Sequence, residues 1–182
     1  MNFKEYVQLA VRTKTDWSNR DEDLVHSALG INSELIELTN ATDGVNRFEE
    51  IGDILWYLAL ASNAMTIDIS SGIENTFEGS TFYYSDEPFN QLSSELSDQI
   101  KRMYFYKDTT QEKDIALSLV CLLQGMNMEY ELTLEDWQCI MEMNIKKLHV
   151  RYPEKFDNDS AIIRTLDTEY STLEEVFNKY VK

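Results

Sequence analysis

The sequence has few of the residues that interrupt helices. Glycine occurs six times and proline only twice in 182 residues. A many-stranded β-sandwich needs frequent turns, so this shortage argues against one and favours long helices joined by few loops. Hydrophobic residues make up 43% of the chain, which is enough for one buried core. We therefore predict an all-α fold, a helical bundle that forms a single domain over residues 1–182.

Long apolar runs, a secretion signal and paired cysteines are also missing. The longest apolar run, from Ile54 to Ala61, is far too short to cross a bilayer. Residues 1–5 carry neither the basic nor the apolar block of a secretion signal. Cys121 and Cys139 lie in apolar helical patterns, and we interpret them as reduced core residues. These features predict a cytoplasmic protein, in the host cytoplasm if a phage encodes it, with no membrane partner.

Basic residues are outnumbered by acidic ones. The chain has 16 Lys and Arg against 33 Asp and Glu, which gives a net charge of −17. A nucleic-acid polymer needs a basic face to neutralise its phosphates, so we expect no partner of that class. Acidity by itself indicates only solubility. The acids become informative where they are clustered within apolar sequence.

Hydrophobic periodicity predicts a series of helices. Thr133 with Asp136, and Thr172 with Glu175, have the spacing of helix-starting capping boxes. In the second helix we expect Leu29 on the buried side. The predicted helices cover residues 3–13, 21–41, 45–65, 88–106, 111–126, 133–152 and a last stretch that starts at residue 172 within a C-terminal helical extension, 157–182. Residues 66–87, rich in Ser, Thr, Gly and Asn, are predicted to form a long loop.

The two central helix pairs resemble each other. A shift of 61 residues overlays residues 33–65 on 94–126 without a gap and gives seven identities. Chance similarity of amphipathic helices and a degenerate internal duplication both explain this match. A duplication predicts a four-helix bundle within one chain, whose second helix pair supplies a wall of the site.

The first copy contains two acidic pairs, Glu34 with Glu37 and Glu50 with Asp53. The three-residue spacing puts both acids of a pair on one face of their helix, and the short segment between the helices lets the two faces align. In the second copy the corresponding residues are Glu95, Asp98, Gln111 and Asp114. Because the amide of Gln111 is a poor replacement for a carboxylate ligand, we expect one competent site per chain.

Four carboxylates brought together need a counter-charge. At about 4 Å and an effective dielectric constant near 20, each pair repels by roughly 4 kcal/mol, against a typical domain stability of about 5–15 kcal/mol. Carboxylate oxygens without cysteine or ligand-spaced histidine favour a hard cation, Mg²⁺ or its substitute Mn²⁺. Mg²⁺ commonly completes its shell with water and phosphate oxygens, which points to nucleotide chemistry. The alternative is that the acids lie on solvated helix faces and bind nothing.

Several segments resemble the MazG-like all-α NTP pyrophosphohydrolases, and the phage-type members above all. Residues 26–37, HSALGINSELIE, and residues 49–60, EEIGDILWYLAL, are similar to the helices that carry that family's two acidic pairs. Residues 144–156, NIKKLHVRYPEKF, resemble its closing segment, and residues 10–13, AVRT, a short motif near its start. The resemblance implies a bundle of the MazG and dimeric dUTPase type. The chain departs from the family by about 65 residues inserted before the closing segment.

The resemblance implies a function as well as a fold. It implies Mg²⁺-dependent hydrolysis of an NTP or dNTP between the α and β phosphates, giving the monophosphate and pyrophosphate. Metal ligands would be Glu34, Glu37, Glu50 and Asp53, and Glu34 or Glu37 would be the general base. Asn144, Lys147 and Arg151 share one helix face and are expected to bind the substrate. Trp56 either stacks on the base or packs in the core. A homodimer or homotetramer is expected.

Three hypotheses follow. The first is the pyrophosphohydrolase, whose base and sugar preference the sequence leaves open. The second is a catalytically silent helical protein that sequesters a nucleotide. The third is a structural bundle whose acids are solvated, which predicts that Mg²⁺ does not stabilise the protein.

Overall fold

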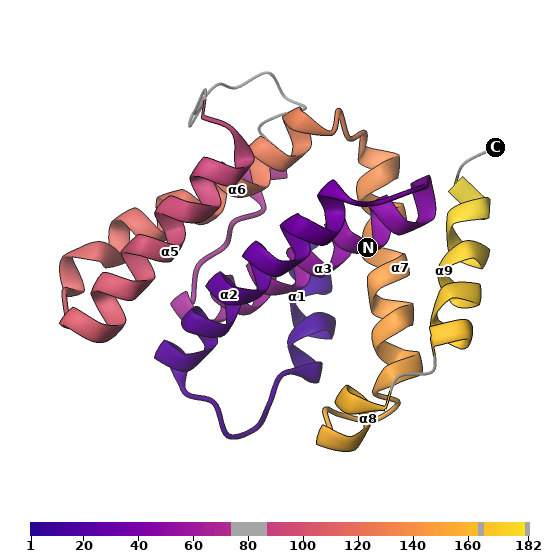
Figure 1. The fold of residues 1–182 in the computed structure, drawn as a ribbon, viewed down its shortest axis with the longest axis horizontal. Coiled ribbons are helices and arrows are strands. Elements are labelled where there is room, and N and C mark those ends of the chain that lie inside the picture. Colours follow the sequence, from indigo (N-terminus) through magenta and orange to yellow (C-terminus); the bar gives the residue numbers. More distant parts are fainter. Residues whose placement is uncertain (74–86, 164–165, 181–182) are drawn as a thin grey trace.

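The computed structural model describes residues 1–73, 87–163 and 166–180, and within these ranges it contains helices and no strand. This confirms the predicted all-α fold. The helices are α1 (Phe3–Ala10), α2 (Arg20–Thr39), α3 (Gly44–Met65), α5 (Phe89–Tyr106), α6 (Glu112–Glu129), α7 (Leu134–Arg151), α8 (Asn158–Ile162) and α9 (Leu166–Tyr180), with 3₁₀ turns at Val11–Thr13 and Thr109–Gln111 (Figure 1).

Local signals fix the ends of α2 and α3, the two helices that carry the acidic pairs. Asn19 and Glu22 form a capping box at the start of α2. The Asp43 side chain accepts a 2.8 Å hydrogen bond from the backbone N–H of Asn46 and so caps α3. Only residues 40–43 separate the two helices. Because this connection is so short, α3 runs back along α2 and brings the two acidic pairs together.

Four helices form a bundle, with α2 against α3, α5 against α6, α2 against α5 and α3 against α6. A hydrogen bond of 2.8 Å from Asn32 Nδ2 of α2 to Ser97 Oγ of α5 links the two helix pairs. Figure 1 shows α5 and α6 on one side of α2 and α3, with α7 and α9 on the other. The core of the four-helix bundle includes Ile51 and Leu58 of α3 and Leu119 of α6, which are 0% exposed.

The second helix pair does not reproduce the acidic site of the first. Glu95, Asp98 and Asp114 are all exposed, and Asp98 is paired with Lys101. The 61-residue shift also fails at the turns, since the connection at residues 40–43 corresponds to residues 101–104, which lie within α5. The internal duplication itself stays a prediction.

Some helices begin and end where the sequence predicted, and others do not. The capping box of Thr133 and Asp136 at the start of α7 is confirmed. The start predicted at Thr172 is wrong, because α9 begins at Leu166 and the Thr172 hydroxyl donates a 2.8 Å hydrogen bond to the Thr168 carbonyl inside the helix. Helix α8 lies within the helical extension expected over 157–182. Of the expected loop 66–87, residues 71–73 are helical, and residues 74–86 lie outside the described ranges.

Two predictions about apolar residues have different outcomes. Leu29 is 68% exposed rather than buried, because it lies in an open groove between α2 and α5. Cys121 and Cys139 are free thiols, and Cys139 is fully buried, as expected for reduced cysteines. In the described ranges, no helix combines the length and apolar character that crossing a membrane requires.

Helix α9 belongs to a second, smaller apolar cluster. Its Leu173 and Val176 pack against Cys139 and Met143 of α7 and Val45 of α3. This cluster attaches the C-terminal helix to α7 and to the first part of α3. Helix α9 therefore lies close to the helix that carries the predicted substrate-binding residues.

Candidate metal centre

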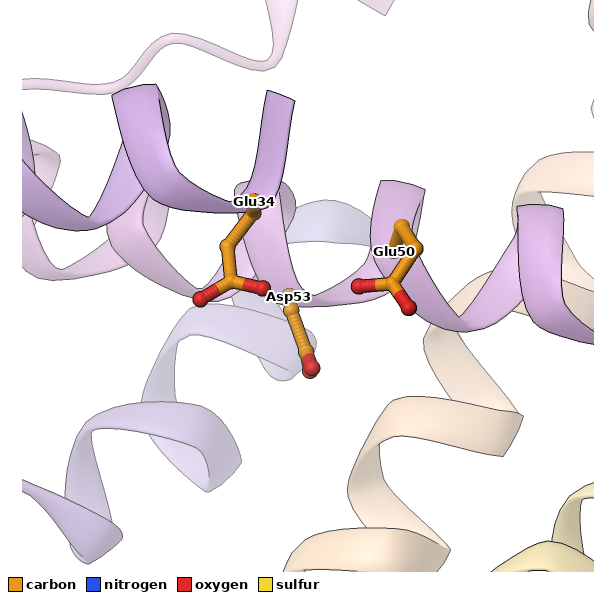
Figure 2. A group of neighbouring side chains, drawn as sticks. All are labelled: Glu34, Glu50 and Asp53. Atoms are coloured by element: carbon orange, nitrogen blue, oxygen red, sulfur yellow. The ribbon is translucent and has the colours of Figure 1, made fainter. Parts of the chain in front are cut away.

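Three of the four predicted metal ligands meet at one point. Glu34 of α2 and Glu50 and Asp53 of α3 each present a carboxylate oxygen, and these three atoms lie within 4.8 Å of one another. Figure 2 shows the three carboxylates pointing toward a common space. Glu37 lies outside this group and is exposed, although it lines the same cavity. The spacing of the acids therefore brings together three carboxylates, with Glu37 beside them.

Residues of α7 hold the Asp53 carboxylate in place. Asn144 Nδ2 donates a 2.9 Å hydrogen bond to Asp53 Oδ1. The Lys147 ammonium group is ion-paired with Asp53 Oδ2 and, over 3.1 Å, with Glu49 Oε1. Lys147 is 1% exposed, so its positive charge is directed entirely at these carboxylates. The basic closing segment thus supplies part of the counter-charge that the acids require.

The crowding of the acids changes their proton affinity. Burial first, and then the charges of Asp53 and Glu37, raise the pKa of Glu34 to about 7. Burial, followed by the charges of Asp53 and Glu49, raises the pKa of Glu50 to about 8. Lys147 acts in the opposite direction on both groups without cancelling the rise. At neutral pH without a metal, the cluster therefore relieves its repulsion by keeping protons.

The carboxylates open into a cavity of about 510 Å³, a size typical of small-ligand pockets. Its lining includes six acidic residues, Glu22, Glu34, Glu37, Glu49, Glu50 and Asp53. Arg151 is the one lysine or arginine among the lining residues that the structure describes. A phosphate chain entering this cavity would be repelled, so an anionic ligand has to bring cations with it.

Aromatic side chains line the same cavity: Trp17, Trp56, Tyr57, Tyr152 and Phe156. The Trp56 indole N–H donates hydrogen bonds to the Ala10 carbonyl over 3.1 Å and to Thr13 Oγ1 over 3.0 Å. Trp56 therefore packs against the end of α1 and the 3₁₀ turn Val11–Thr13, while one part of the ring faces the cavity. Both alternatives given for this residue, core and ligand contact, are compatible with this position.

The predicted substrate-binding residues of α7 have different surroundings. Arg151 lines the cavity, and its Nε and Nη2 donate to the two carboxylate oxygens of Glu169 over 3.1 Å and 2.6 Å. Asn144 and Lys147 are buried beside Asp53 and are not among the lining residues. The wall expected from the second helix pair is wrong for the described residues, since no lining residue belongs to α5 or α6.

Three residues of the site were missed in the sequence. Glu49 directly precedes Glu50, and a pair of adjacent acids could have indicated it. Tyr6 reaches Asn144 from α1 with a 2.8 Å hydrogen bond, and Glu169 reaches Arg151 from α9. Neither contact has a local signal, because each joins residues on separate helices.

The donor set fits a divalent cation. Three carboxylates present oxygens within 4.8 Å of one another, and burial, followed by neighbouring charges, raises the pKa of Glu34 and Glu50. A doubly charged ion that replaced their protons would stabilise such a group. Oxygen donors alone favour Mg²⁺ or Mn²⁺. Comparison with protein family models, with curated proteins and with solved structures found no match to this chain.

Proposed function

We propose that this protein is a Mg²⁺-dependent nucleoside triphosphate pyrophosphohydrolase that cleaves an NTP or dNTP between the α and β phosphates. The observation that carries the proposal is the group of three carboxylates, Glu34, Glu50 and Asp53, in the lining of a ligand-sized cavity. The resemblance of the two acidic helices and of the closing segment to the MazG-like family supports it.

The acidic lining favours a metal-chelated substrate. A triphosphate carries several negative charges, and six carboxylates line the cavity against a single guanidinium. When bound, Mg²⁺ would offset phosphate charge and activate water as the nucleophile. Glu34, Glu50 and Asp53 would hold it, and Mn²⁺ would be a substitute. The cavity's own chemistry thus accounts for the proposed metal dependence.

The remaining residues are assigned by position. Glu37 lines the cavity outside the three-carboxylate group, so we assign it as the general base that accepts a proton from water. Arg151 lines the cavity and would contact phosphate oxygens through the edge of its guanidinium group that does not pair with Glu169. Aromatic rings such as Trp56 and Tyr57 offer faces on which a base could stack.

A panel assay tests the proposal. Purified protein is incubated with each NTP and dNTP in the presence of Mg²⁺, and pyrophosphate and monophosphate are measured. We expect turnover of at least one nucleotide, dependent on Mg²⁺ and lost in Asp53→Asn. Asp98→Asn is the matched control, because Asp98 is an exposed acid outside the cavity. Folded protein that turns over no nucleotide contradicts the proposal, and tight binding without hydrolysis identifies a sequestering protein instead.

A further inference from the structure

Helices α1, α3 and α7 meet at a buried point beside the three carboxylates. Tyr6 of α1 is 0% exposed and Asn144 of α7 is 2% exposed. The Tyr6 hydroxyl donates a 2.8 Å hydrogen bond to Asn144 Oδ1, and Asn144 Nδ2 donates a 2.9 Å hydrogen bond to Asp53 Oδ1. A continuous chain of hydrogen bonds therefore runs from α1 through α7 to a carboxylate of the candidate metal centre.

The Asp53 carboxylate sets the direction in which the Asn144 amide faces, and the Tyr6 hydroxyl anchors the other end of that amide. A side-chain amide has an oxygen that accepts and a nitrogen that donates, and only the nitrogen can face a carboxylate favourably. With the amide nitrogen turned toward Asp53, the amide oxygen faces the Tyr6 hydroxyl, which donates to it and holds the Asn144 side chain in place. A reversed amide would place its oxygen against the Asp53 carboxylate and would lose the hydrogen bond to Asp53, although the Tyr6 hydroxyl could still accept from the amide nitrogen.

Gly52 permits the close approach of α7 at this point. It directly precedes Asp53, and its carbonyl oxygen lies 3.5 Å from the Tyr6 hydroxyl. A Cβ atom added at Gly52 would lie 3.2 Å from Asn144 Cβ and 3.4 Å from Asn144 Nδ2. A larger residue would therefore push Asn144 away from the carboxylate that it contacts.

We propose that Tyr6 and Asn144 are positioning residues that hold the Asp53 carboxylate in the orientation that binds a divalent cation. This inference rests on the metal site of the proposed function. Asn144 takes one lone pair of Oδ1 and Lys147 one lone pair of Oδ2, so each oxygen keeps another for an ion. Groups that orient metal ligands in this way commonly contribute tenfold or more to metal affinity. Asn144 then acts on the metal ligand and not on the substrate.

Calorimetric titration of the full chain with Mn²⁺ tests this role without any nucleotide. Tyr6→Phe removes the hydroxyl and keeps the buried ring, and we expect it to weaken Mn²⁺ binding about tenfold. Tyr180→Phe is the matched control, because it also removes a tyrosine hydroxyl that donates to a side chain of α7. In this case the acceptor is Glu142, over 3.0 Å, on the α9 side of α7. Its Mn²⁺ affinity should equal that of the wild type.

A second variant covers the case in which Tyr6→Phe does not fold. Gly52→Ala leaves the hydroxyl in place and displaces Asn144, and it should weaken Mn²⁺ binding to a similar extent. Wild-type affinity in whichever of these two variants folds would overturn the positioning role while leaving the proposed function intact. A wild-type protein that binds no Mn²⁺ would overturn both.

Discussion

Raising the pH should destabilise the metal-free protein through Glu50. Burial and then the charges of Asp53 and Glu49 raise the pKa of this carboxyl to about 8, against 4.5 for an ordinary glutamate. The folded state therefore holds the proton more tightly than the unfolded chain does. The stability that this proton contributes is complete below pH 4.5 and is lost as the pH rises through about 8.

The size of the effect follows from the shift. A pKa difference of one unit corresponds to about 1.4 kcal/mol, so the rise from 4.5 to about 8 sets an upper bound of about 5 kcal/mol. Water in the cavity screens these charges, so we expect about 2 kcal/mol of stability to disappear between pH 5 and pH 8.

Urea denaturation in the presence of a chelator measures this loss. The free energy of unfolding is determined for the wild type and for Glu50→Gln at pH 5 and at pH 8. The wild-type free energy minus that of the variant should be about 2 kcal/mol smaller at pH 8 than at pH 5. Burial lowers the pKa of His26, which has the opposite pH dependence, but both proteins contain this histidine and its effect cancels. A difference that stays constant or increases refutes the reasoning.

Three other substitutions give distinct outcomes. Lys147→Met removes a buried ammonium group and should destabilise the metal-free protein by about 3–5 kcal/mol, and Mg²⁺ should restore part of that stability. An unchanged melting temperature would contradict this. Glu37→Gln should lower kcat at least a hundredfold with unchanged Mn²⁺ affinity in calorimetry, whereas equal kcat would exclude Glu37 as the base. Glu169→Gln leaves Arg151 without its counter-charge and should cost about 1–3 kcal/mol in urea denaturation; a value near zero would show that the pair does not stabilise α9.

The acidic cluster was predictable because its determinants are local. The three-residue spacing within α3 puts Glu50 and Asp53 on one helix face, and the four-residue connection to α2 brings Glu34 next to them. The same reasoning placed Glu37 beside them, where it is exposed and lines the cavity, and its role as a metal ligand stays a prediction. Periodicity assigns a face to a residue but does not say how far that face extends into the core.

The partners of the cluster were not predictable from local patterns. Lys147 contacts Asp53 across 94 positions of sequence, and Tyr6 contacts Asn144 across 138. Both contacts depend on how α1 and α7 pack against α3, which is a property of the whole bundle. The exposure of Leu29 also depends on how the whole bundle packs, because a helix can carry more apolar residues than the neighbouring helices cover.

Proton release on metal binding tests the central claim most directly. Mg²⁺ is titrated into the metal-free protein at pH 7 by calorimetry, in buffers that differ in ionisation enthalpy, and the number of protons released is obtained from the slope. Because the pKa values of Glu34 and Glu50 are raised to about 7 and about 8, the account predicts a release of roughly one proton or more for each ion bound. Absence of binding, or binding without proton release, would contradict it.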